Sequence, residues 1–389
     1  MGPVRLVESV RCVREDGGVL LVRGREALRV SVRAGRTGEF VEALRGGTTV
    51  EALGSIAAPE RVRALFGKLD SLGWLTGEEA HSEQAVPWDR QVGWFTALTP
   101  DAQAAQRRLC GSEVGILGVG GIGGPAAQHL AAAGVPRLWL IDHDRVAVHN
   151  LNRQYLFGSE DIGRPKTEAA ADALRRLVPE VEVRTVDRRV SGTADLDALP
   201  ASLDLLLLAA DRPRTIGETA WEWARATGTA LLGGAVGLDT GCWGPLLDPA
   251  QGHCLHCFEA RRSARFSSVE RELESRSDPT PYSFGPTNAL IAAFVARDAL
   301  LYLGTGRCES QGRRVVMDVL GIGGRREEAT ADEARCERPG GEGHSGGGPS
   351  PGSAPAAAAP AAADAAQAPA ARTAMTPAPA TTNGTGRHA

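Results

Sequence analysis

The chain has 389 residues, enough for two ordinary domains or for one large domain with appendages. Hydrophobic residues make up 42% of it, so a sizeable core can be buried, and the formal net charge of -4 gives no overall attraction to nucleic acid or to an anionic membrane surface. Seven cysteines are an odd number, which fits a reducing compartment better than a disulfide framework.

The sequence shows neither a signal peptide nor a membrane span. Charged residues such as Arg5 and Glu8 interrupt the apolar residues at the N-terminus. The longest apolar candidate, from Ala289 to Leu303, is broken by Arg297 and Asp298. We therefore expect a soluble, cytoplasmic protein.

Residues 1–82 have the pattern of a small winged-helix-like α+β domain. Three short Val/Leu-rich runs, separated by glycines, indicate antiparallel strands at 9–14, 18–23 and 27–33. Helical spacing of apolar residues follows at 40–44, 50–53 and 62–72.

The helical part of this domain carries a resemblance. The stretches FVEALRGGTTVEALGS and VRALFGKLDSLGWL resemble the PqqD-like leader-recognition domain of enzymes that modify ribosomally made peptides. The resemblance implies that residues 1–82 bind a peptide. A domain that merely packs on a catalytic one is the alternative. A DNA-binding winged helix is disfavoured because the second and third helices carry no dense Lys/Arg stripe.

Residues 88–325 alternate apolar runs with helical stretches, which predicts a Rossmann-like α/β domain with a mostly parallel sheet and helices on both faces. The expected strands are 113–117, 137–142, 181–186, 204–210 and 229–233, and the expected helices are 124–133, 166–177 and 214–226. Residues 326–389, with their run of Gly, Ala, Pro and Thr, are expected to form a disordered tail.

The first strand of this domain runs into a glycine-rich loop and a helix, a pattern that binds phosphates. Gly118, Gly120, Gly121 and Gly123 allow backbone N–H groups to approach a phosphate at the N-terminus of the helix. Asp142 ends the next strand and is placed to accept from ribose hydroxyls. Alone, this pattern is equally typical of a nicotinamide dehydrogenase.

The polar residues that follow distinguish the two. The sequence continues with DHD at 142–144, HNLNRQ at 149–154 and GRPK at 163–166, and the strand LDLLLLAA ends at Asp211. Cations, an amide and carboxylates then gather at the carboxyl edge of the sheet, where open parallel sheets bind ligands. A dehydrogenase needs no such set of charged and polar residues, whereas an enzyme that binds a nucleoside triphosphate with Mg²⁺ does.

This ordered set resembles the ubiquitin-activating-enzyme superfamily, in its ThiF/MoeB and MccB-like branches, over roughly residues 88–322. The resemblance implies an ATP-dependent adenylyltransferase in which the four glycines and Asp142 hold the nucleotide, Asn150, Arg153 and Lys166 contact the phosphates, Asp211 binds Mg²⁺, and Arg90 reaches the γ-phosphate in the other subunit of a homodimer. Asp144 either contacts the ligand or pairs with Arg153, and Gln154 supports the local turn.

Cys254 and Cys257 have the spacing of half a zinc site. The family often supplies a second pair near its C-terminus, but here Cys336 is followed by Pro339 where a fourth ligand is expected. His253, His256, Cys308 and His344 have no convincing spacing. A structural Zn²⁺ and two ordinary thiols both stay open.

Family members that bind their substrate covalently keep a cysteine in the crossover loop, and this chain has none between Cys257 and Cys308. Adenylation without a covalent thiol step is therefore favoured. The run FGPTNALIAAFVARDALLYL looks MccB-like, and this resemblance favours the C-terminal carboxylate of a ribosomally made peptide as the substrate. The alternatives are activation of a ubiquitin-like sulfur carrier of the ThiS/MoaD type, and a non-catalytic leader-binding scaffold for a cyclodehydratase. No nucleic acid or membrane partner is expected.

Overall fold

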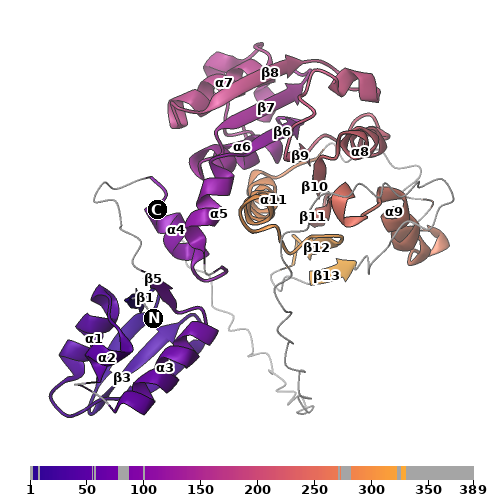
Figure 1. Ribbon diagram of the computed structural model, residues 1–389. Coiled ribbons are helices and arrows are strands. Elements are labelled where there is room, and N and C mark those ends of the chain that lie inside the picture. The colour runs from indigo at the N-terminus through magenta and orange to yellow at the C-terminus, as the bar shows by residue number, and fades with distance from the viewer. Residues whose placement is uncertain are drawn as a thin grey trace, which may run out of the picture. The chain divides into compact units, whose positions relative to one another are not determined.

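A computed structural model describes residues 3–77 except 8, 55 and 57, residues 87–269 except 100, residue 272, residues 282–321, and the backbone of residues 326–329. Residues 4–77 and residues 87–329 have separate sheets and separate hydrophobic cores (Figure 1).

The N-terminal part is the small α+β unit that the sequence predicts. Its sheet consists of β2 (Arg11–Glu15), β3 (Gly18–Arg23) and β4 (Glu26–Ser31), all antiparallel, followed by α1 (Thr37–Gly46), α2 (Val50–Leu53) and α3 (Pro59–Ser71). A further antiparallel pair, β1 (Val4–Leu6) with β5 (Leu75–Gly77), was not predicted. Phe40, Leu44, Leu53, Leu69 and Trp74 are fully buried in its core.

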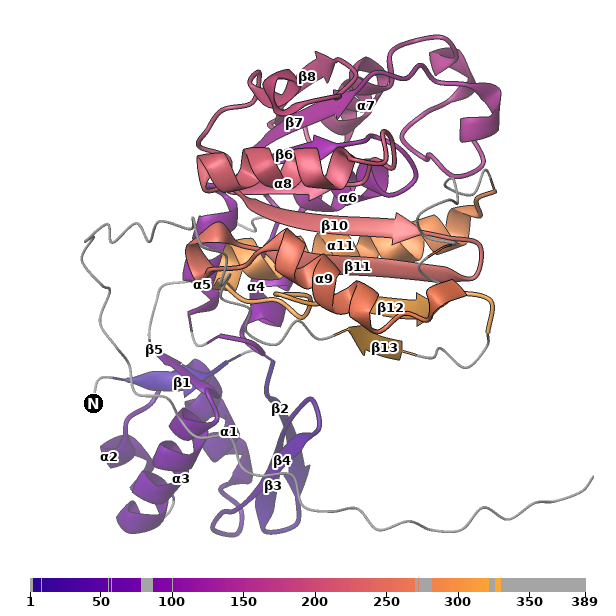
Figure 2. The ribbon, with the colours of Figure 1, turned by 90° about the vertical axis from the view of Figure 1, so that its right-hand side faces the viewer.

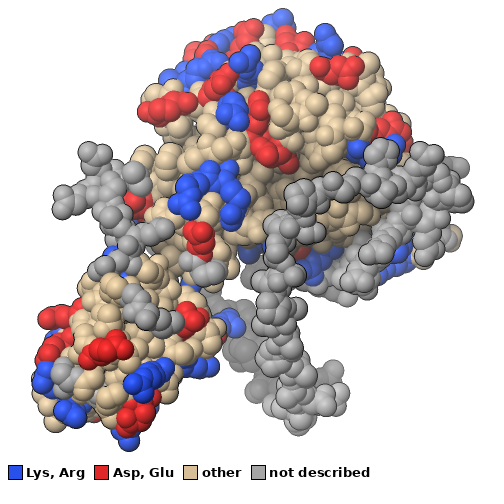
Figure 3. All heavy atoms as spheres, viewed as in Figure 1, with Lys and Arg blue, Asp and Glu red and all other residues tan. Residues whose placement is uncertain are grey.

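The surface of this unit does not have one sign of charge. On the face seen in Figure 3, Lys and Arg side chains alternate with Asp and Glu. Arg29 on β4, for example, forms an ion pair with Glu15 on β2 at 2.7 Å. This mixture is unlike the basic stripe of a DNA-binding domain.

The larger part is built on an eight-stranded sheet of order β13-β12-β11-β10-β9-β6-β7-β8. The five strands from β10 to β8 are parallel, and the three at the other end are antiparallel. In chain order the strands are β6 (Glu113–Leu117), β7 (Arg137–Asp142), β8 (Glu182–Asp187), β9 (Leu205–Leu208), β10 (Ala230–Val236), β11 (Thr240–Leu247), β12 (Arg314–Asp318) and β13 (Arg326–Ala329).

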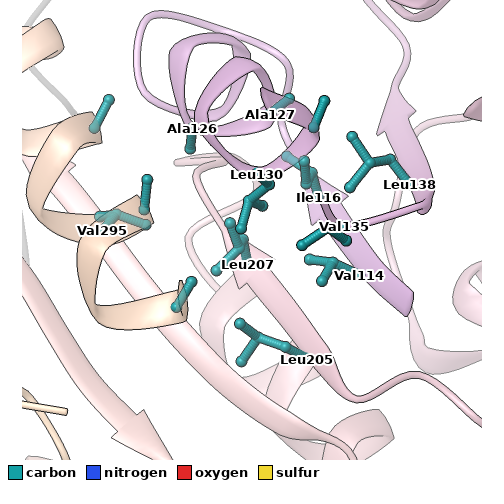
Figure 4. Close-up of a cluster of buried hydrophobic side chains, with 14 of the residues drawn as sticks. Val114, Ile116, Ala126, Ala127, Leu130, Val135, Leu138, Leu205, Leu207 and Val295 are labelled. Atoms are coloured by element: carbon teal, nitrogen blue, oxygen red, sulfur yellow. The ribbon is translucent and has the colours of Figure 1, made fainter. Parts of the chain in front are cut away.

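Helices cover both faces of this sheet, as predicted (Figure 2). One face carries α6 (Gly123–Ala132), α7 (Lys166–Leu177) and α11 (Gly285–Thr305), and the other carries α8 (Ile216–Thr227) and α9 (Leu255–Ala264). Two further helices, α4 (Asp89–Phe95) and α5 (Ala102–Leu109), precede β6. Figure 4 shows part of the core between the sheet and the first of these faces: apolar side chains of β6, β7 and β9 pack against α6, with Val295 of α11 beside it.

The sequence analysis missed several elements of the larger part, and its boundary for the tail needs correction. The antiparallel strands β11 to β13 and the helices α4, α5, α9 and α11 were not predicted as elements. Strand β13 pairs with β12, so residues 326–329 belong to the sheet and not to the tail, whose remaining residues lie outside the described ones.

The exclusion of a membrane span on the ground that Arg297 and Asp298 interrupt the apolar run also needs correction. Within the described residues, α11 alone is long and apolar enough to cross a membrane, with a mean hydropathy of 1.2. It packs against α5, α6, β10 and β11, and 56% of the apolar window is buried, which is typical of a core helix.

Candidate active site

The strand order places a cavity at the carboxyl edge of the parallel strands. Successive strands β6, β7 and β8 run to one side, and β9 returns to the other side of β6. Ligands bind where the strand order of an open α/β sheet reverses in this way. The cavity there has a volume of about 770 Å³, and nine predicted site residues line it: Gly118, Gly120, Gly121, Asp142, Asp144, Asn150, Arg153, Lys166 and Asp211.

The glycines have two different tasks. Gly118 has φ of +95°, and a β-carbon there would lie 2.7 Å from the backbone nitrogen of Ala210, so only glycine lets β6 and β9 end side by side. A β-carbon on Gly123 would collide with the carbonyl oxygen of Gly118. Gly120 and Gly121 line the cavity, whereas Gly123 does not and closes the turn beneath it.

Asp142 is held by the backbone. One carboxylate oxygen accepts from the N–H of Val119 at 2.8 Å, and the other accepts from the N–H of Asp144 at 2.9 Å. A carboxylate has about four lone-pair sites, so both oxygens can still accept from a ligand hydroxyl. The hydrogen bond to Val119 fixes the end of β7 against the glycine loop.

Asp144 and Lys166 form an ion pair inside the cavity. Nζ of Lys166 lies 2.7 Å from Oδ2 of Asp144, and the side chains of Lys166 and Asp144 are 7% and 53% exposed. Burial raises the pKa of Asp144, but the hydrogen bond and charge of Lys166 outweigh burial, so this pKa lies below its usual value. The alternative in which Asp144 pairs with Arg153 was wrong, because Arg153 donates to the carbonyl of His149 and to Asn152.

Asn150 shapes the loop that carries these groups. The residue is 4% exposed, and its side-chain oxygen accepts from the N–H of Ala147 at 2.9 Å. The NH₂ group is therefore the end that remains to donate to a ligand. Arg153 lies in the next turn and lines the same cavity.

Asp211 is a cavity carboxylate that could hold a metal ion, and Asp142 and Asp144 form with His143 a group that could do so as well. Asp142 accepts two backbone hydrogen bonds and Asp144 holds Lys166, whereas Asp211 is exposed and no partner for it occurs among the described residues. Mg²⁺ is usually held by one or two carboxylates together with water and phosphate. Asp211 therefore fits a magnesium ligand.

The sequence missed three further cations in this cavity. Arg188 and Arg189 directly follow β8, and Arg212 directly follows Asp211. With Arg153 and Lys166 they place five cationic side chains against three carboxylates. The excess of positive charge suits a polyphosphate. Their position just after a parallel strand was the signal that would have identified them.

The other half of the cavity is uncharged. Small residues of β10 and of the turn after it, Gly234 to Gly237, line it with Thr240 and Cys242. Tyr282, Ser283 and Asn288 complete this half from the start of α11. Small side chains leave room for an extended backbone.

Arg90 does not line this cavity in its own chain. It is exposed on α4, which is anchored by Trp88 and Gln91 to the carbonyls of Ala132 and Ala133, at the C-terminal end of α6. The cavity lies at the opposite, N-terminal end of α6, about 15 Å away over ten residues. A group on α4 therefore does not reach the cavity within one chain.

Cys254 and Cys257 lie outside the cavity, at the start of α9, and both are half-buried. Among the described residues, no His, Cys, Asp or Glu joins them as a third ligand. His253 accepts from the N–H of Asp248, and burial raises the pKa of Cys308 to about 12, so neither is a ready ligand. Cys336 and His344 are outside the described residues.

Comparisons with known proteins agree with this architecture. The ThiF family model matches residues 89–338. The sulfur carrier protein ThiS adenylyltransferase of Escherichia coli is 36% identical over 169 residues, which are 42% of this chain and 66% of that protein. The molybdopterin-synthase adenylyltransferase of Escherichia coli is 43% identical over 129 residues, 33% of this chain and 50% of that protein. The matches thus span two thirds or less of these relatives.

Among solved structures, that of Escherichia coli MccB with MccA-N7isoASN has a TM-score of 0.70 at 22% identity and covers 84% of this chain and 96% of its own. The structure of MccB with ATP has a TM-score of 0.69 at the same identity and coverage. These likenesses establish the fold.

Proposed function

Because this chain belongs to the ThiF family, we propose that it uses ATP and Mg²⁺ to adenylate the C-terminal carboxylate of a ribosomally made peptide. The main support for the proposal is the cavity at the point where the strand order of the sheet reverses. Nine of the site residues predicted from the sequence line this cavity. The products would be an acyl-adenylate and pyrophosphate.

The charged half of the cavity supports the nucleotide part of the reaction. Asn150, Arg153 and Lys166 would contact the phosphates, and Asp142 the ribose. Mg²⁺, held by Asp211, would offset the charge of the phosphates. A peptide carboxylate is ionised at pH 7 and needs no general base, so positioning and charge neutralisation are sufficient for catalysis.

In this reaction a carboxylate oxygen forms a bond to the α-phosphorus while the bond to pyrophosphate breaks on the opposite side. The uncharged half of the cavity, over Gly234 to Gly237, would receive the last residues of the peptide. The acyl-adenylate would then react with an amide, an amine or a separate sulfur donor, and the residues that line the cavity favour none of these three.

The N-terminal unit supports a peptide substrate. Strand β4 pairs with β3 on one side only among the described strands, so its other edge is open to an added strand. Leu28 and Val30 of β4, Leu65 of α3, and Leu72 directly after α3 are only partly buried against the core of the unit. Arg23 donates to the carbonyls of Leu72 and Gly73, which ties the β3–β4 turn to the end of α3. A leader peptide would lie along β4, beside α3.

The position of Arg90 supports a homodimer with shared sites. Its distance from the cavity of its own chain suits a role in the partner's cavity, where it would contact the γ-phosphate. We place the enzyme in the cytoplasm and assign it no nucleic acid or membrane partner. If zinc is bound, Cys254 and Cys257 supply two of its ligands.

Activation of a sulfur-carrier protein is the second candidate function, and the two adenylyltransferase relatives from Escherichia coli favour it by their names. A further related structure, that of the microcin C7 biosynthetic enzyme MccB in complex with N-formylated MccA, favours the peptide. The non-catalytic scaffold is disfavoured because Asn150, Arg153, Lys166 and Asp211 are all present in the cavity.

Substitutions on the N-terminal unit test the choice between peptide and carrier. Val30→Arg on β4 should raise the KM for a full-length precursor at least tenfold, and leave the KM for a leaderless peptide unchanged. The control is Val13→Arg on the opposite edge strand, where Val13 is already 50% exposed. Deleting residues 1–82 should act as Val30→Arg does, without altering ATP binding. Equal precursor KM values in the folded variants and the unaltered protein would favour a carrier or a small carboxylate as the substrate.

A further inference from the structure

Gln154 is buried at the nucleotide cavity without using its side chain. It is 5% exposed, lines the cavity, and its Oε1 has no hydrogen-bond partner. Its amide forms no side-chain hydrogen bond to any other residue in the described ranges. A buried oxygen left unpaired in this way destabilises the protein, so an amide that makes no side-chain hydrogen bond is unexpected in a purely structural position.

The local turn does not need this side chain. The backbone N–H of Gln154 donates to the carbonyl of Asn150 at 2.9 Å, and its own carbonyl accepts from the N–H of Phe157 at 3.2 Å. Gln154 thus supports the local turn, as the sequence predicts, but through its backbone groups and not through its side chain. A leucine of similar volume would satisfy the turn equally well.

The amide nitrogen lies beside the glycine loop. A β-carbon placed on Gly120 would be 3.6 Å from Nε2 of Gln154, with no other atom within 4 Å. On the other side of the loop, Asn288 lies against Gly121. Of the two ends of this amide, the NH₂ group is therefore the one that faces the loop.

We infer that Gln154 is a nucleotide-binding residue whose NH₂ group donates a hydrogen bond to a phosphate oxygen above Gly120. Phosphate oxygens only accept hydrogen bonds, so an unpaired donor beside a phosphate-binding loop matches them in chemistry. This inference rests on the proposed function, since it requires that the cavity binds ATP.

The test compares Gln154→Leu with Gln106→Leu. Gln106 is also buried, at 6% exposure, but it lies outside the cavity and its amide is paired, donating to the carbonyl of Ala133 and accepting from Gln91. Calorimetry gives the Kd for Mg·ATP and for adenosine, and thermal unfolding without nucleotide reports on structure.

For Gln154→Leu we expect ATP binding about 10- to 100-fold weaker, the usual effect of losing a hydrogen bond to a charged group. Adenosine binding and the melting temperature of the free protein should not fall. Gln106→Leu should show the reverse, with a lower melting temperature and unchanged ATP affinity. Gln154→Glu, which places a carboxylate against the phosphates, should weaken ATP binding further.

Two outcomes overturn the inference. If the unaltered protein binds ATP and Gln154→Leu binds it equally well, the amide does not contact a phosphate. If the variant instead loses melting temperature and affinity for adenosine and ATP alike, Gln154 has a structural role. Absence of ATP binding by the unaltered protein is a separate result, which refutes the proposed function itself.

Discussion

Replacing Asp144 with asparagine tests whether this carboxylate serves Lys166 or the nucleotide. The Lys166 side chain is only 7% exposed, and its ammonium lies 2.7 Å from the carboxylate. Breaking a fully buried ion pair costs about 3–5 kcal/mol. Asp144 is half exposed and asparagine still offers an oxygen to Lys166, so solvent screening reduces the expected loss to about 1–2 kcal/mol.

The assay is chemical unfolding with and without Mg·ATP. Without nucleotide, Asp144→Asn should lower the free energy of unfolding by the amount above. Bound phosphates replace the missing negative charge beside Lys166, so ATP should stabilise the variant more than it stabilises the unaltered protein. The control is Asp172→Asn, which removes an exposed ion pair of similar length, 2.6 Å, with Arg164 outside the cavity. It should have a much smaller effect and leave ATP stabilisation unchanged.

The pH dependence follows from the lowered pKa of Asp144. A carboxyl group whose pKa is lower in the folded state stabilises the protein above its unfolded-state pKa, and this contribution is lost as pH falls through the folded-state pKa. The difference between the two proteins should therefore persist from about pH 5 to 8 and shrink below about pH 4. If Asp144→Asn leaves the free protein unchanged and weakens ATP binding, Asp144 is a ligand contact and the reasoning fails.

Four further outcomes are expected. Asp211→Ala should reduce peptide-dependent pyrophosphate exchange by about 10²–10³ while leaving the fold intact, and full activity would remove it from the site. A mixture of the Arg90→Ala and Asp211→Ala proteins should regain exchange activity, because one of the two sites in a mixed dimer has both Arg90 and Asp211. If the subunits exchange and the mixture stays inactive, Arg90 does not act in the partner's site. Gly118→Ala should destabilise the protein by about 1–3 kcal/mol in urea unfolding, whereas Gly192→Ala, with open space around it, should be near neutral. Cys254→Ser should abolish bound zinc in metal analysis if a structural site exists, and unchanged zinc content would exclude this cysteine.

The parallel half of the larger sheet could be predicted because its signals are local. Strands β6, β7, β9 and β10 contain short apolar runs bounded by turn residues, and α7 and α8 have clear amphipathic spacing. The antiparallel half could not. Strand β11 has the sequence TGCWGPLL, whose Gly and Pro argue against a strand, and its partner β12 comes about 70 residues later.

The candidate site could likewise be predicted from the sequence only in part. Asn150, Arg153, Lys166 and Asp211 could be selected because they occur in the order of a known family. Which other side chains face the cavity depends on the path of each loop, and the sequence does not specify this path. Arg188 and Asn288 therefore escaped prediction, as did the choice of Lys166 over Arg153 as the partner of Asp144.

The most direct test of the central claim is ATP–pyrophosphate exchange with a matched pair of precursor peptides. One peptide ends in a free carboxylate and the other ends in the corresponding amide, with the leader sequence unchanged. The proposed function predicts exchange with the acid and none with the amide, because only a carboxylate can displace pyrophosphate from the α-phosphorus. Exchange that is equal with both peptides, or that a ubiquitin-like carrier supports while neither peptide does, would contradict it.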